Sequence, residues 1–180
     1  MYSIVYADPP WDYAGRVQHN TQEANKSVIH HYPTMTLEEL KKLRVIDICE
    51  KNCLLFMWTS SPHLPQAIEL MKHWGFEYKT LAFVWEKQRK NPGYYTMSQC
   101  EVCIVGKRGC IPSPRGSRNE CQFLSEMRTR HSKKPDEIRN RIARMFPTQK
   151  KVELFAREEC EGWDSWGNEI SKTIMLEHEI

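Results

Sequence analysis

The tetrapeptide Asp8-Pro9-Pro10-Trp11 combines a carboxylate, a backbone carbonyl fixed by proline, and a large aromatic ring. An aromatic amino group is a poor nucleophile because its lone pair is delocalised into the ring. The Asp8 carboxylate and the Pro9 carbonyl can each accept one of its N–H bonds, so that the nitrogen becomes more tetrahedral as it attacks. The Trp11 ring offers a face on which an extruded base can stack. Placing the amine in line with an electrophile would then be largely proximity catalysis.

The same tetrapeptide also has a plain structural interpretation, because Asp-Pro and Pro-Pro are common in turns. The position of the tetrapeptide in the chain favours the catalytic interpretation over the turn. Residues 3–7 form a short apolar strand, and the two prolines end the strand's hydrogen-bond ladder, so Asp8 is expected at the strand's C-terminal end. In open α/β sheets, ligands bind beyond that end of the strands.

The elements that must position this site are predicted from hydrophobic spacing and from helix boundary signals. Helix starts are predicted at three signals: the capping box Thr36-Leu37-Glu38-Glu39, the pair Ser61-Pro62 before a helix ended by Gly75, and Pro135-Asp136-Glu137. Further strands are predicted over 53–58, 78–86, 101–107 and 152–156, with a last one between Trp163 and Asn168. Because strands alternate with helices, we expect one α/β domain over 1–180, with a mostly parallel central sheet and helices on both faces.

The segments between these elements are polar, and one region is strongly basic. Segments 12–35 and 108–134 are expected to be mobile loops, and 87–99 is predicted to be a basic loop containing Tyr94 and Tyr95. The chain's net charge is +3, but 11 basic and 3 acidic residues between positions 87 and 134 leave that region at +8. Such a region is either a solvated face or a surface that attracts an anionic partner such as nucleic acid.

Several classes of protein are disfavoured. The seven cysteines are an odd number and argue against a disulfide framework. Cys100 and Cys103 fall in or beside a predicted strand, where they point to opposite faces, so we expect no metal site. No apolar run approaches the roughly 20 residues of a membrane span, and the N-terminus lacks signal-peptide features, so a cytoplasmic location in a bacterium or a phage-infected cell is expected. There is no G-x-G-x-x-G, so a glycine-fingerprint dinucleotide site is not supported.

The sequence resembles the MT-A70 family of adenine methyltransferases over nearly its whole length. The resemblance rests on several motifs in the family's order: Ala7-Asp8-Pro9-Pro10-Trp11, Tyr32-Pro33-Thr34-Met35, Phe56-Met57-Trp58-Thr59, Pro62-His63-Leu64-Pro65, Gly75-Phe76, the run from His131 to Glu137, the run from Glu153 to Arg157, and Trp163 followed by Trp166-Gly167-Asn168. It implies a Rossmann-like methyltransferase fold in permuted order, with the catalytic motif first and the cofactor strand last. The implied activity is methyl transfer from S-adenosylmethionine to the N6 amino group of adenine.

The resemblance also implies roles for particular residues. Asp8, Pro9, Pro10 and Trp11 would be catalytic, and Asp8 would also lie near the cofactor's methionine amino group. Lys134 would approach the cofactor's carboxylate. The remaining implied cofactor contacts are Phe155, Arg157, Asn168 and Glu169.

Three positions depart from the family pattern. Many members have glycine where this chain has Ala156, histidine where it has Glu159, and some have glutamine where it has Glu169. The contacts beyond Arg157 on the nucleoside side of the cofactor are therefore less firmly implied.

The polymer that carries the adenine is left open between DNA and RNA. DNA is favoured because the chain is hardly longer than a catalytic core, like the phage and bacterial members, and specificity would then come from segments 12–35 and 108–134. Substrate contacts are expected from Trp11, Tyr94, Tyr95, Arg128, Arg130 and His131. A homodimer or a related partner subunit is plausible. A non-catalytic binding partner with this fold, and methylation of a small molecule or a protein glutamine, are the weaker alternatives.

Overall fold

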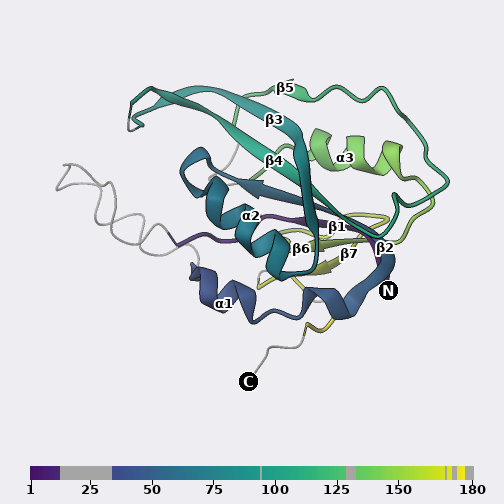
Figure 1. The fold of residues 1–180 in the computed structure, drawn as a ribbon. Helices are drawn as coiled ribbons and strands as arrows, with labels where there is room; N and C mark the ends of the chain where they lie inside the picture. The colour runs from purple at the N-terminus through teal and green to yellow at the C-terminus, as the bar shows by residue number, and fades with distance from the viewer. Residues whose placement is uncertain (13–33, 94, 129–132, 169, 172–173, 177–180) are drawn as a thin grey trace.

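The computed structural model describes residues 1–12, 34–93, 95–128, 133–168, 170–171 and 174–176 of the chain. The described residues form one seven-stranded sheet in the order β5-β3-β4-β2-β1-β6-β7 (Figure 1). The strands are β1 (Tyr2–Ala7), β2 (Cys49–Thr59), β3 (Glu77–Asn91), β4 (Ser98–Arg108), β5 (Phe123–Ser125), β6 (Lys151–Leu154) and β7 (Asp164–Trp166).

The sheet is mixed but mostly parallel, as predicted. β1 pairs in parallel with both β2 and β6, β6 with β7, and β3 with β5. β4 alone runs against its neighbours, pairing antiparallel with β2 and with β3. The C-terminal ends of β2, β1, β6 and β7 therefore meet at one edge of the sheet, which we call the carboxyl edge.

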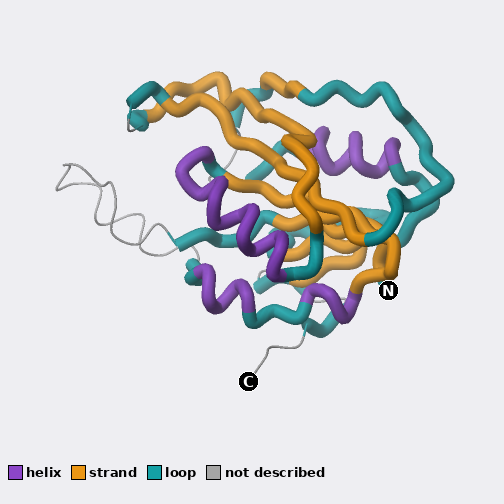
Figure 2. Tube along the Cα trace, viewed as in Figure 1, coloured by secondary structure: helices purple, strands orange, loops and turns teal. Residues whose placement is uncertain are grey.

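Helices cover both faces of the sheet, which confirms the expected layering (Figures 1 and 2). Two helices, α1 (Leu37–Lys41) and α2 (Leu64–His73), contribute Leu40 and Leu70 to a core that includes Val5 and Leu55. The third, α3 (Asp136–Met145), contributes Ile138 and Ile142 to a second core that includes Ile4, Tyr6 and Phe56. Successive side chains of β1 thus alternate between the two cores, as the pleat of a strand buried on both faces requires.

The predicted boundary signals of α1 and α2 are partly confirmed. Glu39 and Thr36 close the capping box, because the Thr36 N–H donates to Glu39 Oε2 at 2.7 Å and the Glu39 N–H to Thr36 Oγ1 at 3.2 Å. Gly75, with φ 84°, follows α2, and the Phe76 N–H reaches Met71 O at 3.0 Å across it. The predicted cap at Ser61 is wrong. Ser61 begins a short 3-10 helix (Ser61–His63), and α2 starts only at Leu64.

The predicted basic loop over 87–99 is also wrong over most of its length. β3 continues to Asn91 and β4 begins at Ser98, so the two strands form a long hairpin whose last pair is Asn91 with Ser98. The predicted strand 152–156 ends earlier, at Leu154, because Phe155 adopts a left-handed conformation with φ 61°.

The described part of segment 108–134 contains a strand, β5, that the sequence did not indicate. β5 extends the sheet beside β3, with Val84 opposite Phe123. Ahead of it, the Gly116 N–H donates to Met145 O at 2.9 Å, which ties the segment to the end of α3. Residues 13–33, which make up most of segment 12–35, and residues 129–132 of segment 108–134 lie outside the described residues. None of the described helices is long and apolar enough to cross a membrane.

We expect Ile142→Ala to destabilise the fold by about 2–5 kcal/mol, because it leaves a cavity in the core beneath α3. Ile142 is 0% exposed, whereas Met175 is 82% exposed and supplies a matched control. Met175→Ala should change the free energy of unfolding by no more than about 0.5 kcal/mol. Urea unfolding of the two variants checks this, and equal losses would contradict the assigned core.

Candidate active site

Asp8 leaves β1 at the carboxyl edge, between β2 and β6. Its preceding residue, Ala7, lies opposite Met57 of β2 and Leu154 of β6, and the Asp8 N–H points to Leu154 O at 3.5 Å. The predicted position at the end of the first strand is therefore confirmed. Asp8 itself is half-buried.

The two prolines after Asp8 form a tight connection to the next segment. The Trp11 N–H donates to Pro9 O at 2.9 Å, and the Met35 N–H donates to Pro10 O at 2.8 Å. The Pro9 carbonyl is thus already used once, but a carbonyl oxygen has a second lone pair with which it can accept an incoming N–H.

Lys134 brings a buried positive charge to Asp8. Its Nζ lies 2.9 Å from Asp8 Oδ2 and 3.2 Å from Glu101 Oε2, a residue of β4. Lys87 of β3 is 3.2 Å from the other oxygen of Glu101. Successive ion pairs therefore link four charged residues in one line: Lys87, Glu101, Lys134 and Asp8. We call this line the inner chain. It is neutral as a whole, which lets the four groups be largely removed from water together.

Burial and pairing shift the pKa values of Asp8, Glu101 and Lys134. Burial raises the pKa of Asp8, and the nearby ammonium of Lys134 only partly offsets it. Burial would also raise the pKa of Glu101, but Lys134 and Lys87 outweigh that effect and hold the pKa below its ordinary value. Burial would lower the pKa of Lys134, but the Asp8 and Glu101 carboxylates outweigh it, so its pKa is raised and the side chain remains charged.

Trp11 is 6% exposed, so its ring does not present an open face to a base. The Trp11 Nε1–H donates to Trp58 O at 3.2 Å, and the ring stacks on His63 with centroids 6.1 Å apart at 19°. His63 is half-buried, and it is the more accessible ring of this pair. The geometry gives no support to direct base stacking on Trp11.

Three other tryptophans are core residues. Trp58, Trp74 and Trp85 are at most 2% exposed. Trp58 also belongs to the site, because the Lys134 Nζ lies 5.7 Å from the centroid of its ring, within cation–π range.

The turns after β6 and β7 pack closely together beside Asp8. The Ala156 N–H donates to Trp166 O at 3.0 Å, and a Cβ added at Gly167 would lie 2.1 Å from Ala156 O. Only glycine permits this approach of the two backbones. Phe155 packs against Trp166 with ring centroids 5.4 Å apart.

The residues that the resemblance assigns to a cofactor meet at this edge. Phe155 follows β6, Asn168 follows β7 and is exposed, and Arg157 lies close enough for its charge to lower the pKa of Asp8. This set offers a cation for a carboxylate, through Lys134, and amide and guanidinium groups for hydroxyls. These are the groups that S-adenosylmethionine presents, so the described residues fit that cofactor. Glu169 lies outside the described residues.

The expected substrate contacts are only partly described. Tyr95 is fully exposed in the connection between β3 and β4, and Arg128 is half-buried after β5. Tyr94, Arg130 and His131 lie outside the described residues. Within the described part of the chain, no group of three or more histidine, cysteine or acidic side chains is arranged to hold a metal ion.

Sequence reasoning missed three residues of the site: Lys87, Glu101 and His63. A signal for Lys87 was present, because Phe83, Trp85 and Lys87 alternate on one face of β3 and all three are buried. Had this alternation been followed, it would have predicted a strand that continues past residue 86, with Lys87 on its buried face. His63 lies in the motif Pro62-His63-Leu64-Pro65, but the motif gave it no role in the site, and no local pattern marks Glu101.

Comparison with known families agrees with this geometry. The MT-A70 family profile matches residues 2–169, a span that includes Asp8, Glu101, Lys134 and Arg157. The chain belongs to the MT-A70 family. Its sheet is accordingly the Rossmann-like methyltransferase sheet of that family, and the protein is a methyltransferase.

Relatives of two kinds resemble this MT-A70 member. The type II methyltransferase M.MunI of a Mycoplasma species is 46% identical over 181 residues, covering 94% of this chain and 78% of that protein. The human N(6)-adenosine-methyltransferase catalytic subunit METTL3 is 27% identical over 192 residues, covering 99% of this chain. The chain spans only 30% of the length of METTL3.

We expect Glu101→Gln to lower the pKa of Asp8, because it removes a like charge and leaves the Lys134 ammonium to Asp8 alone. Lys134→Met should raise the same pKa. Carboxyl carbon-13 NMR titration measures both, with the Asp8 signal assigned by its loss in Asp8→Asn. Glu161, which is exposed, gives the control variant Glu161→Gln. An unchanged Asp8 titration in Glu101→Gln would contradict the shared ion pair.

Proposed function

We propose that this chain transfers a methyl group from S-adenosylmethionine to the N6 amino group of adenine in DNA. The observation that carries the proposal is the half-buried Asp8 carboxylate at the end of β1, held by Lys134 beside the β6 and β7 turns. An acceptor at this edge suits an amine nucleophile, and the neighbouring groups suit the methyl donor.

In the proposed reaction, two hydrogen-bond acceptors hold the adenine amine and several other groups bind the methyl donor. The Asp8 carboxylate accepts one N–H of the adenine amine, and the second lone pair of Pro9 O accepts the other. S-adenosylmethionine would supply the methyl group: the N–C bond would form as the S–CH3 bond breaks, S-adenosylhomocysteine would leave, and the methylated amine would then lose one proton to Asp8 or to water. Lys134 pairs with the donor's carboxylate, while Arg157 and Asn168 hold its hydroxyls. Asp8 does not need to remove a proton before attack, so its raised pKa is compatible with the role as long as it stays ionised.

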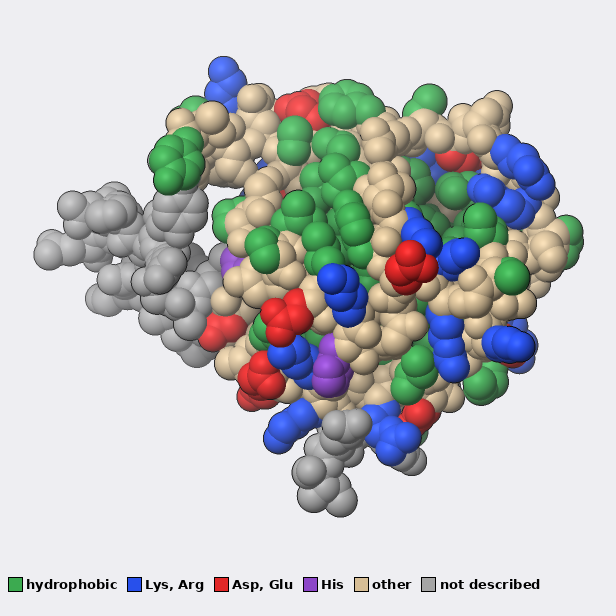
Figure 3. All heavy atoms as spheres, in the orientation of Figure 1, with side chains coloured by type: hydrophobic (Ala, Val, Ile, Leu, Met, Phe, Trp, Pro, Cys, Tyr) green, Lys and Arg blue, Asp and Glu red, His purple; other side chains and the backbone are tan. Residues whose placement is uncertain are grey.

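A nucleic-acid polymer is favoured by the β3–β4 hairpin. Its tip carries Arg89, Lys90, Tyr95 and Met97, all exposed. Figure 3 shows exposed basic and apolar side chains where Figure 1 places this tip. Cations beside an exposed aromatic ring bind phosphates and stack on bases. Because β3 runs in the direction of β2 and β1, the tip extends beyond the carboxyl edge where Asp8 lies.

DNA is favoured over RNA by the comparison of relatives. The chain is 46% identical to a type II methyltransferase and 27% identical to the human N(6)-adenosine-methyltransferase catalytic subunit. RNA adenine is the alternative, and the second kind of relative supports it. We also propose that the protein acts in the cytoplasm of a bacterium or phage-infected cell, as a homodimer or with a related subunit.

Transfer of labelled methyl groups to an oligonucleotide panel tests the reaction. We expect label on N6-methyladenine from DNA, detected by nucleoside analysis of single- and double-stranded DNA and RNA. Asp8→Asn should lower the transfer rate by about 10²- to 10³-fold, because the variant keeps the shape but loses the charged acceptor. Circular dichroism verifies its fold, and Glu161→Gln should retain the parent rate. A folded Asp8→Asn that keeps most of its activity would overturn the mechanism.

Lys134→Ala should weaken binding of S-adenosylmethionine about 10- to 100-fold, the worth of one charge-assisted hydrogen bond. Binding of an oligonucleotide should weaken by less than about twofold, since Lys134 is turned inward to Asp8 and Glu101. Calorimetry with each ligand measures the two losses. Lys150→Ala, which alters an exposed lysine, is the control. Equal losses for the two ligands would count against the assigned role.

A further inference from the structure

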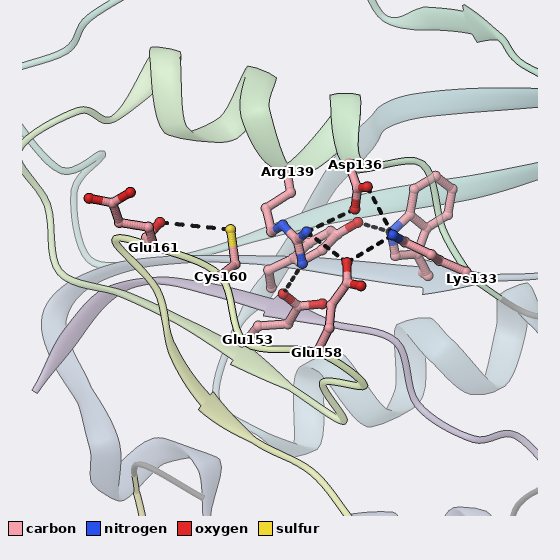
Figure 4. Close-up of polar contacts among 9 residues, drawn as sticks. Lys133, Asp136, Arg139, Glu153, Glu158, Cys160 and Glu161 are labelled. Carbon is pink, nitrogen blue, oxygen red and sulfur yellow. Dashed lines mark hydrogen bonds and ion pairs between the residues drawn. The ribbon is translucent and has the colours of Figure 1, made fainter. Parts of the chain in front are cut away.

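Arg139 lies at the centre of a second ion-pair cluster beside the inner chain (Figure 4). Its Nη1 is 2.8 Å from Glu153 Oε2, and its Nη2 is 2.8 Å from Asp136 Oδ1 and 3.2 Å from Glu158 Oε1. The three carboxylates belong to β6, to the first turn of α3 and to the turn after β6. The Arg139 side chain is only 9% exposed.

Lys133 completes this cluster. Its Nζ lies 2.9 Å from Asp136 Oδ2 and 2.9 Å from Glu158 Oε1, so Glu158 and Asp136 each bind both cations (Figure 4). We call these five residues the outer clamp. The clamp ties the turn that contains Arg157 and Glu158 to the segment that enters α3.

The outer clamp and the inner chain meet at one peptide bond. Lys133 belongs to the clamp and Lys134 to the inner chain, so the two neighbouring ammonium groups serve different clusters. Any movement of the 133–136 segment would therefore move Lys134 relative to Asp8. The clamp holds that segment through Lys133 and Asp136, while Lys134 pairs with Asp8.

A contribution to stability alone is a weak explanation for such a cluster. Buried ion pairs are often replaced by apolar residues without loss of stability, because desolvation cancels much of the attraction. Arg139 also leaves its Nε buried without a hydrogen-bond partner among the described residues. What the guanidinium provides is geometry, because its planar fork binds three carboxylates from three elements in fixed directions.

We propose that Arg139 is a positioning residue for the methyl-donor site, fixing Lys134 and Arg157 at the spacing that the donor requires. This rests on the proposed function, in which those two residues bind S-adenosylmethionine. In this proposal Arg139 acts through Lys133, Asp136 and Glu158, and it contacts neither S-adenosylmethionine nor the adenine. Its role is to keep the turn after β6 and the start of α3 together while the donor binds between Asp8 and that turn.

The chain contains a matched control on the same helix. Arg144 makes a bidentate ion pair with Glu120, with distances of 2.9 and 2.8 Å, and a further pair with Glu137. It is a salt-bridged arginine of α3 like Arg139, but its partners lie in segment 108–134 and on α3 itself. Loss of Arg144 thus reproduces the loss of a helix ion pair without touching the turn after β6.

The test measures binding of S-adenosylmethionine and of an adenine-containing DNA oligonucleotide by calorimetry. We expect Arg139→Met to weaken donor binding about five- to tenfold, Arg139→Lys to fall between it and the parent, and Arg144→Met to change it by less than about twofold. Oligonucleotide binding should change by less than about twofold in every variant. In steady-state kinetics, KM for the donor should rise while kcat at saturating donor stays within about twofold, a split that a general loss of folded protein does not produce.

A second variant keeps the proposal testable if Arg139→Met fails to fold. Glu158→Gln removes the carboxylate shared by Arg139 and Lys133 and should weaken donor binding about threefold or more. Unchanged donor binding in a folded Arg139→Met or in Glu158→Gln overturns the positioning role while the proposed function stands. A parent protein that does not bind S-adenosylmethionine overturns the proposed function and this inference together. If Arg139→Met and Arg144→Met weaken donor binding equally, the positioning role of Arg139 is also overturned.

Discussion

One buried ammonium shared by two carboxylates holds the site of this protein together. Lys134 pairs with Asp8, 126 residues away in the chain, and also with Glu101. A charge this far from water is costly unless it is paired, so the end of β1, the first half of β4 and the segment that enters α3 must all be in place for it to be stable. The site is therefore not carried by any single element, and its geometry depends on the whole sheet having the right strand order.

The part of the site that sequence could predict is the part with local signals. Asp8 was placed correctly because an apolar strand and two prolines adjoin it, and the start of α1 because Thr36 and Glu39 form a capping box. Lys87 and Glu101 could not be paired in this way. Glu101 lies opposite Trp85, so Lys87 is its diagonal neighbour on the same face, and that relation depends on the register of two antiparallel strands. The register of two paired strands is set by the tertiary fold and cannot be read from the sequence of either strand alone.

Trp11 shows a different limit of sequence reasoning. The residue type suits base stacking, but the structure uses Trp11 as a buried anchor that binds Trp58 O and packs on His63. A large aromatic ring beside a strand end gains more from burial than from exposure, particularly when its N–H finds an acceptor. Whether such a ring faces solvent depends on the neighbouring end of β2 and on the segment that contains Met35, which bridges to Trp11. Neither could be read from the tetrapeptide.

The tripeptide Lys133-Lys134-Pro135 explains how two charge clusters can share one short segment. A residue before proline is pushed toward extended backbone, and consecutive side chains of an extended segment point to opposite sides. Lys134 can therefore face Asp8 while Lys133 faces Glu158. Pro135, with φ −59°, then directs the chain into α3. The first residue of α3, Asp136, places a favourable negative charge at the helix N-terminus and is also an ion-pair partner in the outer clamp. A local backbone constraint thus joins the acceptor at the end of β1 to the turn after β6, which are the two halves of the site.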